Sequence, residues 1–181
     1  MNSHEASGET HLVVRAMQPK DYGRVSEIMA SCFHHLADKE SWSEAQLETL
    51  LQDARAGKLA EMASNPSFHF RVALKDYSLV GVVLWIRNEI GKLYVDPPAH
   101  RNGVGIRLFH AAEKEITDEG YEEIRLTTPV TSVPFYVAMG MAVEERRPWE
   151  TATFSGQNLF VMAKKASRLG DSRRQIKMGE K

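Results

Sequence analysis

Apolar residues in the first part of the chain recur at a helical spacing. Between positions 25 and 36 they fall three or four residues apart, which predicts one buried helical face made of Val25, Ile28, Met29, Cys32, Phe33 and Leu36. Ser43 and Gln46 form a capping-box pair ahead of a leucine-rich stretch. A second helix is therefore expected there, with its end near Gly57. A short helical turn is expected at residues 59–63.

Later segments show the patterns of strands. An uninterrupted apolar run at residues 79–86 is typical of a central strand. Other strands are expected at residues 12–16, 68–74, 89–95, 122–128, 142–147 and 157–164. A helix is expected at residues 103–117, and a short one between Pro134 and Gly140. The order βααβββαβαββ predicts an α+β fold with a mixed sheet.

Composition limits the class of protein. The 181 residues fit one domain, expected at residues 11–165 between a disordered segment at 1–10 and a mobile basic tail at 166–181. A net charge of −1 disfavours nucleic acid and anionic membranes as partners. The single cysteine, Cys32, excludes an internal disulfide, and no secretory signal or membrane span is recognisable. A cytoplasmic location is expected.

The most informative segment runs from Leu93 to Leu108, where a strand, a bend containing prolines and a Gly-x-Gly turn lead into a helix. The start of a helix offers unpaired N–H groups to a phosphate, and Gly103 and Gly105 let an anion approach the backbone. A dinucleotide fingerprint would need glycine where Leu108 stands, and no G-K-[ST] follows for a Walker A loop. The ligand is therefore expected to be another phosphorylated cofactor.

This segment resembles the pyrophosphate loop of the GNAT superfamily of acyl-CoA-dependent N-acyltransferases. In that family a strand ending near Val-x-Pro precedes [Arg/Gln]-x-x-Gly-x-[Gly/Ala] and a helix. Here Val95-Asp96-Pro97 precedes His100-Arg101-Asn102-Gly103-Val104-Gly105, with His100 in the place of Arg or Gln. A second segment, Ser132-Val-Pro-Phe-Tyr-Val-Ala-Met-Gly-Met141, resembles the signature A-x-x-[FL]-Y-x-x-x-G-F. Met141 and Pro129 depart from a usual Phe and Asn, and the resemblance covers about residues 12–165.

The resemblance implies a mostly antiparallel sheet with helices on both faces, and acetyl-CoA as co-substrate. A free backbone N–H of Tyr94 or Val95 would contact the thioester oxygen, and the amides of residues 101–106 would hold the pyrophosphate. The expected cofactor-binding residues are Tyr94, Val95, His100, Arg101, Asn102, Gly103, Val104, Gly105 and Ile106.

The resemblance also implies two catalytic residues, and each has a plainer alternative. Tyr136 matches the tyrosine that protonates or hydrogen-bonds the departing CoA sulfur, and its alternative is a core aromatic packed with Phe135 and Met139. Glu89 matches a catalytic glutamate of the histone-acetylating branch, but could be a solvent-facing turn residue. The acceptor pocket would lie between residues 34–42 and 147–156, which hold aromatic and acidic side chains.

The expected reaction is direct attack of a primary amine, on a small molecule or a peptide, on acetyl-CoA in a ternary complex. The first alternative is a non-catalytic acyl-CoA sensor of the same fold, and the second is a nucleotide-binding oxidoreductase, disfavoured by Leu108. No metal is expected, because His34 and His35 lack ligand spacing. The oligomeric state stays open, with a homodimer as one alternative.

Overall fold

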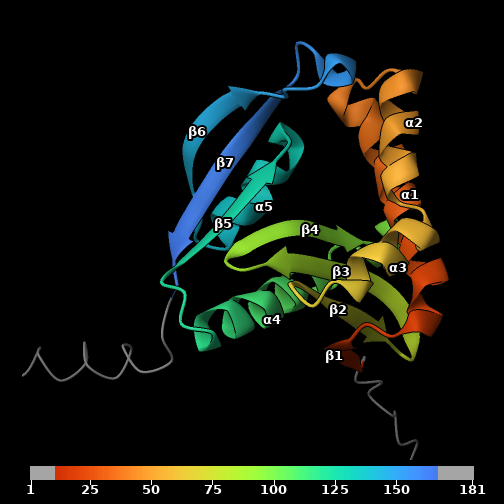
Figure 1. Cartoon of the computed structure of the whole chain (residues 1–181), viewed down its shortest axis with the longest axis vertical. Helices are drawn as coiled ribbons and strands as arrows, with labels where there is room; N and C mark the ends of the chain where they lie inside the picture. The colour runs from red at the N-terminus through yellow and green to blue at the C-terminus, as the bar shows by residue number, and fades with distance from the viewer. Residues whose placement is uncertain (1–10, 167–181) are drawn as a thin grey trace, which may run out of the picture.

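The computed structural model of the protein describes residues 11–166, and in this range seven strands form one sheet (Figure 1). The strand order is β1-β2-β3-β4-β5-β7-β6, and the β4–β5 pair is the parallel one. The strands are β1 Leu12–Ala16, β2 Phe68–Lys75, β3 Ser78–Ile86, β4 Glu89–Val95, β5 Glu123–Thr128, β6 Ala142–Pro148 and β7 Asn158–Lys165. The predictions for residues 1–10 and 167–181 lie outside the described residues.

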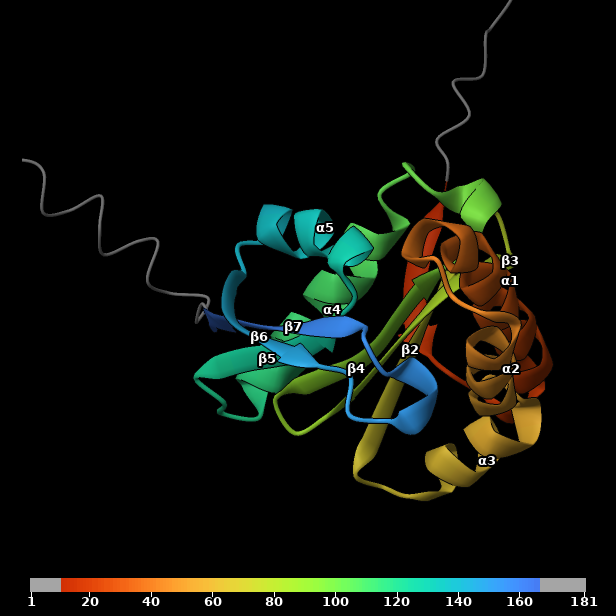
Figure 2. The same ribbon diagram turned by 90° about the horizontal axis from the view of Figure 1, so that it is seen from above.

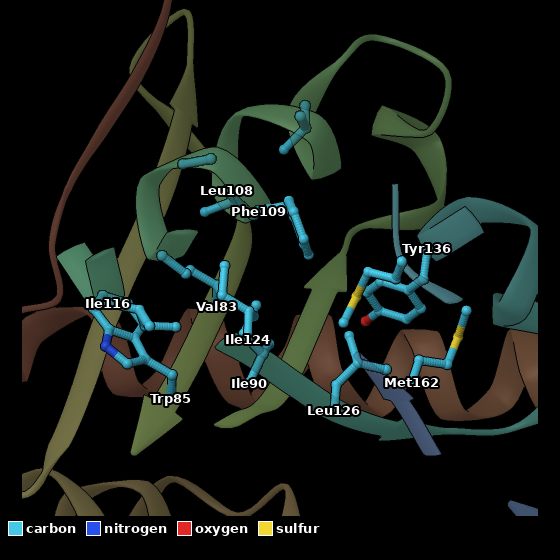
Figure 3. Packing of buried hydrophobic residues seen from close by; sticks show 14 of the residues in the cluster. Val83, Trp85, Ile90, Leu108, Phe109, Ile116, Ile124, Leu126, Tyr136 and Met162 are labelled. Carbon is cyan, nitrogen blue, oxygen red and sulfur yellow. The ribbon is translucent and has the colours of Figure 1, made fainter. Parts of the chain in front are cut away.

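Helices cover both faces of this sheet, as Figure 2 shows. They are α1 Tyr22–Glu40, α2 Glu44–Asp53, α3 Ala56–Ser64, α4 Val104–Asp118 and α5 Val133–Ala138, with short 3₁₀ turns η1 Pro19–Asp21, η2 Pro97–Ala99, η3 Val130–Ser132 and η4 Ala152–Phe154. One hydrophobic cluster lies under α1, α2 and α3, and the other under α4 and α5 (Figure 3). The predicted class, α+β with a mixed, mostly antiparallel sheet between helices, is confirmed.

Two expectations about the N-terminal helices were wrong. The first helix continues to Glu40 and ends where Ser41 takes a left-handed conformation, so residues 34–40 are helical and not a loop. Gly57 does not end the second helix but lies inside a separate nine-residue helix, α3. Arg55, the residue before α3, makes no side-chain cap, so no capping signal marks the start of this helix, and the turn expected at residues 59–63 lies inside it. The capping box of Ser43 and Gln46 is present, with bonds of 2.8 and 3.3 Å.

The sheet divides between β4 and β5. The two strands pair only at Glu89 with Arg125 and at Ile90 with Leu126. A β-bulge follows at once, because Ile90 lies opposite Trp85 while Lys92 lies opposite Leu84, which leaves Gly91 as the extra residue. A bulge bends its strand, and the rest of β4 runs away from β5, as Figure 1 shows. We call the opening between the strands beyond Ile90 the β4–β5 gap.

Close packing at Gly81 sets the position of α4 against this gap. A Cβ at Gly81 would lie 2.9 Å from Leu108 Cδ1 and 3.0 Å from the carbonyl oxygen of Tyr94. Only glycine allows β3 this approach. The first turn of α4 is thereby held against the end of β4, where the phosphate-binding loop was expected.

A buried ion pair holds the other end of α4 to the C-terminal strands. Lys164 Nζ of β7 lies 2.7 Å from Glu113 Oε1 of α4, and both side chains are mostly buried. The same ammonium donates to the carbonyl oxygen of Met139, at the end of α5. These contacts fix α5, and Tyr136 with it, relative to α4.

Candidate functional site

Backbone groups of β4 point into the β4–β5 gap at alternate residues. The Asp96 N–H donates to the Val80 carbonyl of β3 at 2.8 Å, directly beyond the Val95–Gly81 pair. In an antiparallel ladder such bonds occur at every second residue, so the Tyr94 amide also faces β3. The amides of Leu93 and Val95 therefore face the gap, where β5 offers them no pairing.

This geometry decides which of the two expected backbone N–H groups can contact a thioester in the gap. Val95 keeps a gap-facing N–H, whereas the Tyr94 amide is turned toward β3. The Tyr94 side chain packs on the α1 face, edge-on to Phe33 at 5.3 Å, and burial raises its pKa. Leu93 joins Val95 as a candidate that the sequence motif did not identify, because strand register is not visible in it.

The loop before α4 has the form of an anion-binding nest. Arg101 and Gly103 both take left-handed conformations, with φ of +64° and +75°. The Arg107 N–H bonds to the Gly103 carbonyl at 3.0 Å, so the preceding amides of Val104, Gly105 and Ile106 lack intrahelical partners. A Cβ at Gly103 would meet no protein atom within 4 Å. Open space beside free amides at a helix start fits a pyrophosphate group.

Side chains of this loop brace it internally. The Asn102 side-chain amide donates to the carbonyls of Ala99 and His100 at 3.3 and 3.1 Å. His100 Nε2 lies 2.8 Å from the Val95 carbonyl oxygen, which also accepts a bond from Cys32 Sγ at 3.1 Å. Burial raises the pKa of the Cys32 thiol to about 12, so it stays protonated and donates. The Val95 peptide is thus held from both the loop and α1.

A shallow hollow of about 410 Å³ lies beside the loop, next to the free amides. It is lined by Asn102, Gly103, Ile106, Arg107, Leu12 and Lys75. The cations Lys75 and Arg107 suit a phosphorylated ligand. Lys75 ends β2 and could not have been found from the loop sequence, since only the folded sheet brings it here.

Tyr136 lies on α5, across the gap from β4. Its side chain packs between Phe109 and Phe135, and the residue is 7% exposed. Figure 3 shows the hydroxyl pointing away from the helix toward Leu126 of β5. It has no hydrogen-bond partner among residues 11–166, yet the Trp85 indole is the only fully enclosed unpaired side-chain polar group there. The Tyr136 oxygen is therefore not fully enclosed, although burial raises the pKa of this hydroxyl.

Glu89 lies at the start of β4, on the sheet face that carries α1, α2 and α3. It borders a groove of about 170 Å³, the Glu89 groove, whose other lining residues are Arg125, Leu126, Thr127, Glu145, Arg147 and Val161. Glu89 and Glu145 have no ion pair within the described residues, whereas Arg125 is bound to Glu123 and Glu144. The groove thus presents two unpaired carboxylates beside the point where the sheet divides.

The two segments expected to wall the acceptor pocket meet in space. Trp149 and Phe154 stack at 3.8 Å, and Trp42 lies edge-on to both at 6.4 and 6.2 Å. At the end of α1, Glu40 Oε1 accepts a hydrogen bond from the Thr131 N–H at 3.0 Å. The end of α1 is thereby tied to η3, the turn that precedes α5. His34 and His35 are exposed on α1, outside these contacts.

Among residues 11–166, no three His, Cys, Asp or Glu side chains gather as they would around a metal ion. No helix there has the length and apolar character needed to cross a membrane.

A family model described as an acetyltransferase (GNAT) domain matches residues 38–165 of the chain. The chain belongs to the GNAT acetyltransferase family. The match includes the loop before α4, the β4–β5 gap and Tyr136, so the resemblance to this family in sequence is confirmed. No curated protein matched the chain by sequence.

Solved GNAT structures share this fold at low identity. A GCN5-related N-acetyltransferase from Rhodopseudomonas palustris superposes with a TM-score of 0.75 at 21% identity, over 84% of this chain and 94% of that chain. The PaiA N-acetyltransferase from Thermoplasma acidophilum, solved in complex with coenzyme A, gives 0.70 at 24% identity, over 86% and 99%. The aminoglycoside 6′-N-acetyltransferase from Enterococcus faecium gives 0.63 at 20% identity, over 86% and 98%.

Proposed function

We propose that this GNAT protein transfers an acetyl group from acetyl-CoA to a primary amine, in a ternary complex and without a covalent enzyme intermediate. The observation that carries the proposal is the loss of a strand partner for β4 beyond Ile90. It leaves the Leu93 and Val95 amides facing a gap that Tyr136 closes from the other side. Coenzyme A in the related PaiA structure supports acetyl-CoA as the donor.

In this proposal, different residues of the chain carry out the separate steps of acetyl transfer. The Leu93 or Val95 N–H donates to the thioester oxygen as negative charge develops there. Glu89 takes a proton from the attacking amine, directly or through water. Tyr136 gives its proton to the sulfur as the carbon–sulfur bond breaks, so free CoA leaves as a thiol. The amides of residues 101–106 hold the pyrophosphate, and Lys75 and Arg107 add positive charge beside them.

The alternative is a non-catalytic acyl-CoA sensor with the same binding site. The two functions are separated by measuring thiol release from acetyl-CoA across a panel of primary amines, with Tyr136→Phe as the chemically impaired variant. An enzyme releases thiol with at least one amine, and the variant slows it. A sensor binds CoA and releases no thiol with any amine.

A matched pair of glycine variants tests the CoA site itself. Gly103 and Gly120 lie at opposite ends of α4, both with positive φ and both with open space where a Cβ would be. Valine at either position should strain the backbone by about 1–2 kcal/mol. Only Gly103→Val places a branched side chain beside the phosphate amides, and it should weaken CoA binding at least tenfold in calorimetry. Equal CoA affinities in the two variants would place the pyrophosphate elsewhere.

A further inference from the structure

Lys92 is a half-buried cation on β4, next to the gap-facing amide of Leu93. It lies opposite Leu84 in the β3–β4 ladder, so its side chain is on the face of α1, α2 and α3, the same face as Glu89. None of the residues 11–166 forms an ion pair or hydrogen bond with its ammonium. Burial lowers the pKa of Lys92, and the charge of Asp53 at the end of α2 only partly opposes this.

A half-buried ammonium without a bonded partner is costly for a protein that gains nothing from it. An apolar side chain of similar length would pack as well beside Leu84. The arrangement is explained if a bound molecule supplies the missing anion.

Glu89 indicates which molecule this is. The bulge at Gly91 places Glu89 and Lys92 opposite Ile86 and Leu84, two residues apart on β3, so the two side chains leave β4 about 7 Å apart on one face. Despite their opposite charges they form no ion pair with each other. A ligand with an ammonium at one end and a carboxylate at the other can bridge them through charge-assisted bonds.

Building on the proposed function, we propose that the acceptor is an amine that also carries a carboxylate, such as a free amino acid, and that Lys92 binds this carboxylate. The amine then lies toward Glu89 and the β4–β5 gap. A cationic amine without a carboxylate would place like charge beside Lys92 and bind less well. Lys92 is thus a specificity-determining residue.

The test is calorimetry on protein saturated with CoA, titrated with the common amino acids, each beside its own carboxamide. The two members of a pair differ only in the carboxylate. At least one amino acid should bind wild-type protein about ten- to a hundredfold more tightly than its carboxamide. Lys92→Met should remove this preference and Lys92→Arg should keep it. Lys58→Met, at an exposed lysine of α3 paired with Glu61, is the control and should keep it too.

The proposal is overturned if no amino acid binds, if carboxamides bind wild-type protein as tightly as the acids, or if Lys92→Met weakens both equally. The last result would give Lys92 a role in chemistry or folding. Thiol release measured on the same panel keeps the two proposals separate. Turnover of carboxamides or simple amines alone would leave the acetyltransferase proposal standing without this one. Preferential binding of amino acids without thiol release would support carboxylate binding by Lys92 and contradict the acetyltransferase proposal.

Discussion

Replacing Tyr136 by phenylalanine should separate a chemical role of the hydroxyl from a packing role of the ring. A chemical role predicts a lower kcat at unchanged or higher stability, whereas a packing role alone predicts an unchanged kcat. Phenylalanine keeps the ring that packs between Phe109 and Phe135 and removes only the hydroxyl. That hydroxyl has no partner among residues 11–166, so its removal breaks no bond described in the protein.

The stability change follows from that environment. Burying a hydroxyl without a hydrogen bond costs about 1–3 kcal/mol. The Tyr136 oxygen is not fully enclosed, so it retains part of its hydration and the lower end applies. Tyr136→Phe should therefore leave stability unchanged or raise it by up to about 1 kcal/mol, a shift of about 2–4 °C in Tm for a chain of this size.

The catalytic rate of Tyr136→Phe, in contrast, should fall. A positioned general acid is worth about 10²–10⁴-fold, so kcat should fall at least tenfold while CoA affinity stays nearly constant. Burial raises the pKa of Tyr136 above its ordinary value of about 10, so the hydroxyl stays protonated at neutral pH. Loss of this proton should therefore produce no descending limb in the kcat profile below pH 10.

The assay is thiol release at saturating substrates beside thermal unfolding of the same preparations. Tyr121→Phe is the control, since Tyr121 is a half-buried tyrosine of the same core outside the gap and its variant should keep the wild-type kcat. An unchanged kcat in Tyr136→Phe, with chemistry limiting the rate, would refute the acid role. A Tm several degrees lower would show that the hydroxyl supports the fold.

Three further predictions concern the base, the packing of α4 and the buried ion pair. If Glu89 is the base, Glu89→Gln should remove the ascending limb of the kcat/KM pH profile, and an unchanged limb would assign that ionisation to the amine or another group. Gly81→Val should destabilise the protein by about 1–3 kcal/mol in denaturant unfolding and also weaken CoA binding, because the backbone oxygen of Tyr94 cannot move aside. Lys164→Met should cost about 3–5 kcal/mol. Burial raises the pKa of Glu113, but bonds from Lys164 and His110 outweigh it and lower the pKa from 4.5. The pair's contribution should thus be complete above pH 4.5 and be lost below it, and unfolding that is equally acid-sensitive without Lys164 would contradict this.

The features that were predicted correctly from the sequence are those that a short segment of the chain determines by itself. Alternation and caps located β4 at its observed bounds and α4 to within a residue or so of them. The Gly-x-Gly turn indicated free amides at the start of α4 because that property belongs to one short segment. Helix α3 was predicted only as a short helical turn at residues 59–63, because neither end carries a strong signal. The length of α1 was underestimated because polar residues continue it past its apolar face.

The remaining features of the candidate site depend on distant segments. Strand register decides that Leu93 and not Tyr94 turns its amide to the gap, and register comes from pairing with β3. Lys75, Lys92 and Glu145 have no recognisable motif, since each gains its setting from a neighbouring strand or helix. His100, a departure from the family motif, lies against the Val95 carbonyl, a contact that no motif could reveal.

The short seam between β4 and β5 bears on how the protein unfolds. Two residue pairs join these strands, while every other neighbouring pair of strands in residues 11–166 shares at least five. Strands β1 to β4 form one block with a continuous ladder, and β5, β7 and β6 form a second. Beyond this seam, side chains join the blocks through the hydrophobic core under α4 and α5 and through the buried Lys164–Glu113 pair. A ligand bound across the β4–β5 gap would add contacts between the two blocks, so the protein should unfold more cooperatively with that ligand than without it.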